Sequence, residues 1–493
     1  MTAVASSVPA VRRRRLNEAA GRKEGDYVLY WMTAARRTRS NFALQHAVEL
    51  ARGLSRPLVV LEALRVGYAD ASDRLHRFVL QGMADNRARF AKKPATHLAY
   101  VEPSPGAGKG LLEALAAQAC CVVTDDFPCY FLPRMTAAAA AKLAVAVDAV
   151  DGNGLYPMRA TERVFTTAHS LRVHLQKELK PHLLELPAED PFKGVKLPEL
   201  AALPRGLEKR WPMASDALLE ASPAALAALP IDHTVGPAVL QGGSEAGEAR
   251  MAAFVAQRLK RYEEDRSEPE LEGTSGLSPY LHFGHVATHD VFRAVVKQEG
   301  WSVDKLGPSN GGSKAGWWKM SAPAEAFLDE LITWRELAYN MASHRPDDYF
   351  RFDSLPDWAQ KTLKAHERDE RPHLYSLEAL DAARTHDPLW NAAMGQMKRD
   401  GWFHNYMRML WGKKILEWSP SAPEALARME RLMNRYSLDG RNPCSYSGYF
   451  WVLGRYDRPW GPERPIFGAI RYMSSDNTAK KFSVKKYVEK YAP

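Results

Sequence analysis

Residues 402–418 read WFHNYMRMLWGKKILEW, a segment that carries oxidisable aromatic side chains and fixed cations together. Trp411 and Trp418 are seven residues apart. An α-helix therefore places them on one face, about 10 Å from each other at a rise of ~1.5 Å per residue, a spacing that suits electron hopping between indoles. Arg408, on the adjoining face, could hold a phosphate, a carboxylate or the edge of a planar cofactor. The alternative is an amphipathic helix whose aromatics only fill the core.

The composition favours a large protein with a polyanionic partner. The chain has 493 residues, more than one core normally supports, so two domains are expected. It carries 67 Lys and Arg against 58 Asp and Glu, a formal net charge of +9. Its 13 Trp, 19 Tyr and 17 Phe also supply many flat surfaces for stacking on bases or on a planar cofactor.

Several classes of protein are disfavoured. The four cysteines (Cys120, Cys121, Cys129 and Cys444) lack paired metal-ligand spacing, so we expect a reducing compartment, no disulfide framework and no metal site. No run of 18 apolar residues occurs, and no membrane span is expected. Residues 1–24 hold Arg12 to Arg15 but no apolar signal core, and they predict a disordered basic arm.

The rest of the chain divides into three parts. Residues 25–184 alternate β-rich runs with helical stretches, which predicts a parallel, Rossmann-like sheet covered by helices. Residues 185–246 are rich in Pro, Ala and Leu and predict an interdomain linker packed over the surface. Residues 247–493 predict an all-helical domain with helices over 324–342 and 395–418. The strands are expected at 27–31, 58–61, 97–101, 121–124 and 143–147.

The segment from Tyr262 to Gly284 contains the run Thr274-Ser275-Gly276-Leu277-Ser278 before a predicted helix. Backbone N–H groups and the hydroxyls there could bind a phosphate, although a plain helix N-cap explains the same residues. The segment resembles the pyrophosphate-binding signature of the photolyase and cryptochrome superfamily, including the Tyr twelve residues before the Thr.

Three more blocks resemble the same superfamily, and specifically its class II cyclobutane pyrimidine dimer photolyases. They are residues 327–337 (FLDELITWREL), 385–393 (THDPLWNAA) and 438–473, which contains Asp439-Gly440-Arg441 and Asp457-Arg458-Pro459-Trp460. With residues 29–32 and 41–44, the likeness covers nearly the whole chain. It implies an antenna-type α/β domain followed by a helical domain that binds FAD and DNA. The implied activity is light-driven electron transfer from reduced FAD to a flipped-out pyrimidine dimer, whose ring then splits.

The resemblance also implies roles for individual residues, all named by their numbers in this chain. Glu330 would hydrogen-bond the dimer, which Trp334 and Trp451 flank, although an ion pair of Glu330 with a neighbouring Arg is the alternative. Trp390, Trp411 and Trp418 match the family's photoreduction triad. The residues implied to bind FAD are Tyr262, Thr274, Ser275, Gly276, Leu277, Ser278, Asn405, Arg408, Asp439 and Gly440; those implied to bind DNA are Glu330, Trp334, Trp451, Arg458, Trp460 and Arg471.

The chain departs from the family pattern near the expected flavin. The usual Gly-Lys-Met-His-Gly run is replaced at Gly401–Asn405, the usual Asp-Pro-Asn-Gly at Asn442–Ser445, and the Asn expected near flavin N5 falls at Met433 or Asn434. These departures leave a cryptochrome-like FAD photoreceptor as the alternative to a repair enzyme. A basic nucleic-acid-binding protein without a cofactor is a third hypothesis.

The family often holds an antenna chromophore in the α/β domain, either a deazaflavin, a folate or a second flavin. The sequence does not distinguish these. The expected partner is double-stranded DNA that contains pyrimidine dimers, bound by a monomer. We expect a cytoplasmic protein associated with the nucleoid, or a nuclear or organellar one in a eukaryote.

Overall fold

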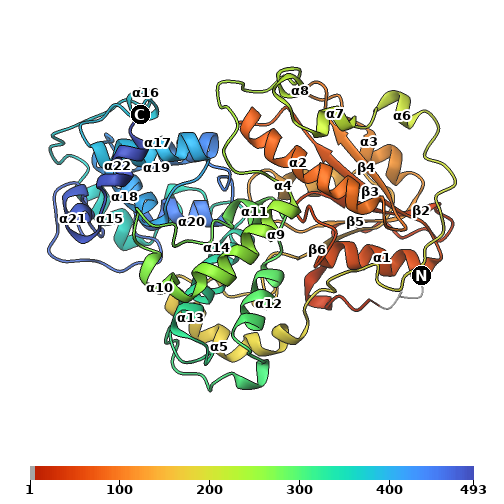
Figure 1. Cartoon of the computed structure of the whole chain (residues 1–493), viewed down its shortest axis with the longest axis horizontal. Helices are drawn as coiled ribbons and strands as arrows, with labels where there is room; N and C mark the ends of the chain where they lie inside the picture. Colours follow the sequence, from red (N-terminus) through yellow and green to blue (C-terminus); the bar gives the residue numbers. More distant parts are fainter. Residues whose placement is uncertain (1–5) are drawn as a thin grey trace.

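The computed structural model describes residues 6–493, which form an α/β part followed by a helical part (Figure 1). The α/β part is built on one six-stranded sheet in the order β1-β6-β5-β2-β3-β4. Five strands are parallel, and β1 pairs antiparallel with β6. The strands are β1 Arg13–Arg15, β2 Tyr27–Met32, β3 Leu58–Leu64, β4 Thr96–Val101, β5 Ala119–Asp125 and β6 Val147–Val150.

The central strand β2 shows why these runs are apolar throughout. Helices cover both faces of the sheet, so neither face can be polar. Val28, Tyr30 and Met32 pack in the core that contains α1 (Phe42–Leu54). Tyr27, Leu29 and Trp31 point to the other face, into the core that contains α3 (Leu111–Ala116). The predicted α/β fold is confirmed, and the last strand lies a few residues later than expected.

The N-terminal arm is a correction to the sequence analysis. Residues 1–5 of the predicted arm lie outside the described residues, but from residue 6 the chain is ordered rather than disordered. Its arginines meet acidic partners at the sheet edge: Arg14 lies 2.9 Å from Asp126 and Arg15 lies 2.6 Å from Asp148. Arg12 is fully buried and donates to Leu155 O at 2.7 Å. A cationic run can be ordered where carboxylates neutralise it, and here they come from Asp126, just after β5, and from Asp148 in β6.

Residues 185–246 hold short helices, α6 Leu207–Arg210, α7 Asp216–Leu219 and α8 Pro223–Ala227. The helices α7 and α8 pack beside α2 (Asp73–Phe90), and Ala214, between α6 and α7, donates its N–H to Ala99 O of β4 at 2.8 Å. The helix before them, α5 (Ala168–Leu184), belongs by its contacts to the helical part, since Arg172 lies 2.8 Å from Asp329. This helix lies before the boundary predicted at residue 184, and that boundary stays a prediction.

The helical part contains the predicted helices with two differences. The helix expected over 395–418 is broken, because Gly401 takes φ 73° and ends α17; α18 begins at Asn405. The helix expected over 324–342 is continuous but contains a π-helical turn, Asp329–Trp334. The helices are α9 Ser244–Ala253, α10 Tyr262–Asp265, α11 Ser278–His282, α12 Thr288–Gln298, α13 Ala322–Leu328, α14 Arg335–His344, α15 Asp357–Ala365, α16 Leu377–Asp381, α17 Pro388–Asp400, α18 Asn405–Glu417, α19 Ala422–Tyr436, α20 Pro443–Val452, α21 Ser475–Lys481 and α22 Lys485–Tyr491. Within residues 6–493, no helix combines the length and apolar character that crossing a membrane requires.

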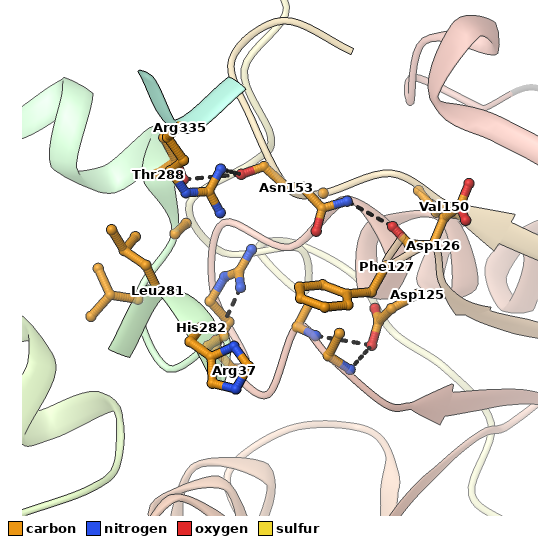
Figure 2. A pocket seen from close by; sticks show the side chains of 16 residues that line it. Arg37, Asp125, Asp126, Phe127, Val150, Asn153, Leu281, His282, Thr288 and Arg335 are labelled. Carbon is orange, nitrogen blue, oxygen red and sulfur yellow. Dashed lines mark hydrogen bonds between the residues drawn. The ribbon is translucent and has the colours of Figure 1, made fainter. Parts of the chain in front are cut away.

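Polar contacts join the two parts around a cavity of about 20 Å³, room for about one water (Figure 2). Asp125, at the end of β5, accepts the N–H of Ala34 at 2.7 Å and of Ala35 at 3.0 Å. Two bonds cross between the parts: Arg335 of the helical part donates to Asn153 O at 2.7 Å, and Arg37 of the α/β part donates to Gly284 O at 3.0 Å. The junction is thus held by directional bonds as well as by apolar packing.

Glu336, beside this junction, makes stability depend on pH. It accepts the N–H of Leu155 at 2.7 Å and of Tyr156 at 3.1 Å, and burial raises its pKa to about 7. A carboxyl whose pKa is raised by folding stabilises the fold below its unfolded pKa, and this contribution is lost as pH rises through about 7. Relative to Glu336→Gln, the wild type should therefore lose about 3 kcal/mol of unfolding free energy between about pH 4 and about pH 8. Thermal unfolding of the wild type and of Glu336→Gln across this pH range measures the loss. Curves of stability against pH that run parallel for the two proteins would contradict the prediction.

Candidate functional site

The three predicted tryptophans form one buried chain. The rings of Trp390 and Trp411 are nearly parallel, with centroids 6.5 Å apart. Those of Trp390 and Trp418 are 5.5 Å apart at 69°. Trp418 is the C-cap residue of α18. Trp390, on the neighbouring helix α17, joins the other two.

Hydrogen bonds fix this arrangement. Trp390 Nε1 donates to Trp411 O at 3.0 Å, and the N-cap residue Asp387 accepts Trp390 N at 3.0 Å. At the other end of the chain, the ring of Phe403 lies 5.7 Å from that of Trp411. The Arg408 guanidinium lies 5.2 Å over the Phe403 ring. The chain therefore runs from Trp418 through Trp390 and Trp411 toward Arg408.

Two residues that the sequence analysis did not single out contact the outer tryptophan. The rings of Tyr375 and His386 each lie 5.3 Å from that of Trp418. Their side chains are hydrogen-bonded to each other, with Tyr375 Oη 2.7 Å from His386 Nδ1. His386 is exposed, so the pair connects Trp418 to solvent. The only sequence signal was that His386 belongs to the 385–393 block.

Arg408 and Asp439 form the predicted ion pair. Arg408 Nη2 lies 3.1 Å from both carboxylate oxygens of Asp439. Burial raises the pKa of Asp439, but Arg408 and the hydroxyls of Ser278 and Ser437 outweigh it, so the pKa lies below its ordinary value. Asp439 therefore stays ionised. It lies in the loop after α19, and its partners Ser278 and Arg408 come from α11 and α18.

The other residues expected at the flavin lie in α10, in the loop before α11, at the start of α18 and next to Asp439. Gly440 passes close to α19, where a Cβ would stand 2.7 Å from Met433 O, so only glycine fits. Asn405 is exposed at the start of α18. Thr274, Ser275, Gly276 and Leu277 form the loop before Ser278, in which Ser275 O accepts Arg250 Nε at 3.1 Å. Tyr262 lies behind the loop, packed against Phe327 at 5.2 Å.

Buried polar atoms near the ion pair test whether a cofactor fits there. Among the described residues, Arg408 Nε, Trp411 Nε1 and Tyr449 Oη are buried without a hydrogen-bond partner. Buried polar groups are normally paired, so such a cluster is typical of a site that binds a polar ligand. Arg408, Trp411 and Tyr449 therefore fit a planar cofactor with several acceptor and donor atoms, as FAD is.

Glu330 takes part in the ion pair that the sequence analysis named as its alternative. Arg266 Nη1 donates to Glu330 Oε1 at 2.6 Å, and the same guanidinium lies 5.6 Å over the Tyr262 ring. Glu330 and Trp334 both lie in the π-helical turn Asp329–Trp334, which does not stack residues four apart as an α-helix does. Burial nevertheless raises the pKa of Glu330, more than Arg266 lowers it. The carboxyl therefore takes up a proton more readily than an ordinary Glu.

Four of the residues expected to bind DNA are brought together. Arg471 lies 5.5 Å over the ring of Trp451 and 4.1 Å over that of Trp460, and Arg458 lies 5.0 Å over Trp460. Asp457 holds two of them, accepting Arg471 Nε and Trp460 Nε1 at 3.0 Å each. Among the described residues, no hydrogen bond or ring contact joins this group to Glu330 or Trp334.

A cavity of about 730 Å³ lies at the carboxyl edge of the sheet. Trp31 and Tyr100 line it from the strands and Ala138 from α4 (Leu132–Ala140), while His282 and Arg441 reach it from the helical part. Its size and aromatic walls suit a planar molecule the size of a cofactor. The sequence analysis expected an antenna chromophore in this part of the chain but named no residue for it.

Known proteins show where the chain belongs. No protein-family model matches it. It is 32% identical over 484 residues to the deoxyribodipyrimidine photo-lyase of Methanothermobacter thermautotrophicus, covering 98% of both chains. It is 34% identical to that of Oryza sativa subsp. japonica, covering 97% of this chain and 89% of the relative. The chain belongs to the photolyase family. The relatives include a marsupial photo-lyase, that of Potorous tridactylus, at 31% identity over 94% of this chain.

A solved photolyase has the same fold. The class III photolyase from Agrobacterium tumefaciens superimposes with a TM-score of 0.63 at 19% identity, covering 96% of this chain and 87% of its own. The two-part photolyase architecture predicted from the sequence is therefore confirmed.

Proposed function

We propose that this photolyase-family chain repairs cyclobutane pyrimidine dimers in DNA, using light absorbed by bound FAD. The observation that carries this proposal is the buried tryptophan chain, which leads from Trp418, contacted by exposed His386, to the Arg408–Asp439 pair. This chain is a continuous series of readily oxidised rings. It fits a protein whose cofactor must be reduced by electrons drawn from outside.

Arg408, Asp439, Gly440, Asn405, Tyr262 and residues 274–278 would hold the cofactor. When bound, reduced FAD supplies an excited-state electron donor. The protein's part is to bind and orient: the Arg408 cation stabilises negative charge in a low-dielectric setting, and ionised Asp439 holds the cation in place. The readily protonated Glu330 can donate a hydrogen bond to a pyrimidine carbonyl, with Trp334 in the same turn available for stacking.

The cationic group around Trp451 would hold the DNA. Flipping a damaged base pair out of the duplex costs a few kcal/mol, and less than for intact bases because the lesion stacks poorly. Trp460 and Arg471 can fill or brace the vacated space, and exposed Arg458 can reach the phosphates. We propose that the protein acts as a monomer on double-stranded DNA, in whichever compartment holds that DNA.

The experiment is light-dependent repair. Purified, reduced protein should restore intact thymines in an oligonucleotide that carries one thymine dimer, under blue light but not in the dark. Bound FAD should be visible in the absorption spectrum of the same sample. Repair that is absent in light, with FAD bound and reduced, would contradict the proposal.

We further propose that the 730 Å³ cavity holds an antenna chromophore. Ala138 lines it from α4, and Ala138→Trp should fill part of it without touching the helical part. The variant should lose any second absorption band while its repair yield per photon absorbed by FAD stays unchanged. Extraction of the wild-type protein identifies the compound as a deazaflavin, a folate or a second flavin. A second chromophore that Ala138→Trp retains in full would place it elsewhere.

Tyr375 gives a prediction about the outer end of the tryptophan chain. Its hydroxyl is hydrogen-bonded to His386 and its ring contacts Trp418, so it can pass an electron to oxidised Trp418 while His386 takes the phenolic proton. In Tyr375→Phe, the oxidised Trp418 should persist longer and photoreduction should be less efficient. Transient absorption after a flash measures the lifetime of the Trp radical; an unchanged lifetime would exclude this step.

A further inference from the structure

Cations and aromatic rings alternate through five side chains, from the protein surface to its core. Arg458 lies 5.0 Å over Trp460, Arg471 lies 4.1 Å over Trp460 and 5.5 Å over Trp451, and Lys413 lies 5.1 Å over Trp451. Arg458 is exposed, Trp460, Arg471 and Trp451 are half-buried, and Lys413 is fully buried. The series thus begins at the proposed DNA surface and ends inside the molecule.

Lys413 is unusual because its charge has no carboxylate partner. Its side chain is 1% exposed, and its Nζ donates to Val452 O at 2.6 Å. Within the part of the chain that the structure describes, no Asp or Glu lies within salt-bridge distance of it. Burying an ammonium without a counter-ion destabilises a fold, so a position that needed only packing would be better filled by Leu or Met. Its neighbours Val452 and Trp451 both belong to the end of α20.

We propose that Lys413 is a positioning residue for lesion recognition, which holds Trp451 in place through its contact with the ring and its bond to Val452 O. This inference rests on the proposed repair function, in which Trp451 flanks the dimer. A charged Lys413 pulls the ring inward, and the bond to Val452 O fixes the backbone next to it. Arg471, held by Asp457, can then contact the same ring from the DNA-facing segment.

The ionisation of Lys413 supports this role and supplies a readout. Burial lowers its pKa to about 7, Asp457 raises it and Arg471 lowers it further. These two, both in the 457–471 segment, are the charged groups that act on it; Lys414 on its own helix is paired with Glu417 instead, at 2.8 Å. Nearby DNA phosphates would raise the Lys413 pKa. Binding of DNA is therefore favoured when Lys413 is charged, and weakens as pH rises through the pKa of the free protein.

The experiment measures binding in the dark, where no photochemistry intervenes. Dissociation constants of the FAD-loaded protein for a thymine-dimer duplex and for the same duplex undamaged are measured from about pH 6 to about pH 9. The proteins compared are the wild type, Lys413→Met, Lys413→Arg and Lys398→Met. Lys398 is a matched control, since its ammonium also donates to a backbone carbonyl, Asp381 O at 2.9 Å, and also lies over a ring, Tyr436 at 5.2 Å.

Near pH 6, Lys413→Met should lose about tenfold of the preference for damaged DNA, the scale of a desolvated cation–aromatic contact. Its preference should vary less with pH than that of the wild type, and its melting temperature should not fall, because a buried charge has been removed. Lys413→Arg should retain the preference at every pH, and Lys398→Met should follow the wild-type curve. If Lys413→Met fails to fold, the wild type and Lys413→Arg still test the proposal, because only the wild type should lose its preference for the dimer as pH rises.

The outcomes separate this inference from the proposed function. A wild-type protein with no preference for the dimer at any pH would overturn both. A preference that Lys413→Met keeps, with the wild-type dependence on pH, would overturn the role of Lys413 alone. Equal effects in Lys413→Met and Lys398→Met would mean that only the total charge matters, which also contradicts it.

Discussion

Replacing Trp390 by phenylalanine is expected to stop photoreduction of the bound FAD, down to the level of a protein with no internal electron donor. Trp390 is the middle member of the chain, 6.5 Å from Trp411 and 5.5 Å from Trp418 between ring centroids. Phenylalanine keeps an aromatic ring between α17 and α18, but it loses the bond to Trp411 O and is far harder to oxidise. One substitution therefore interrupts both links. The measurement is the rate at which the oxidised flavin bands bleach under blue light with an external reductant.

The matched control is Trp317→Phe, in a buried tryptophan that packs against Trp318 away from this chain. It should photoreduce at the wild-type rate. Trp390→Phe should still repair dimers when its flavin is reduced chemically, because the chain serves reduction and not repair. Photoreduction at the wild-type rate in Trp390→Phe would show that electrons reach the flavin by another route.

Replacing Glu330 by alanine is expected to lower repair by about 100-fold, the effect of removing one pre-organised hydrogen-bonding group from the place where charge develops in the reaction. Burial raises the pKa of Glu330 in spite of Arg266, so the carboxyl is suited to donate a proton in a hydrogen bond. Without it, negative charge that develops on the dimer has no donor at this position. Repair per photon absorbed by pre-reduced protein is the measurement.

Glu330→Gln is the control, since its amide still donates, and its loss should stay within about tenfold. Arg266→Met removes the ion pair instead, which should raise the pKa of Glu330 further and extend repair to higher pH. Repair by Glu330→Ala at the wild-type yield would show that Glu330 is only the structural partner of Arg266.

The sheet could be predicted from the sequence because each strand of a doubly covered sheet is a short apolar run. The pair of Arg408 and Asp439 and the three tryptophans could be assigned only by resemblance, residue by residue. The order of the tryptophans could not be foreseen, because the sequence does not show that α17 packs on α18 and places Trp390 between the others. The prediction of one unbroken helix over 395–418 also missed the end of α17 at Gly401.

Other features depend on contacts between distant segments. The N-terminal arm is ordered by ion pairs of Arg14 with Asp126 and of Arg15 with Asp148. These carboxylates lie more than a hundred residues further along the chain, so the sequence near the arginines does not predict the pairs. The π-helical turn at Glu330 and its pairing with Arg266 likewise follow from tertiary packing. Lys413 looks like one of two ordinary lysines in the sequence, and only its burial beneath Trp451 distinguishes it.

The most direct test of the account is a single-flash measurement on chemically reduced protein bound to a thymine-dimer duplex. One flash should restore intact thymines in the wild type and equally in Trp390→Phe, whereas Glu330→Ala should restore few. That pattern would separate the residues that act on the dimer from those that only reduce the flavin. A wild-type complex with reduced FAD that absorbs the flash and restores no thymine would contradict the account.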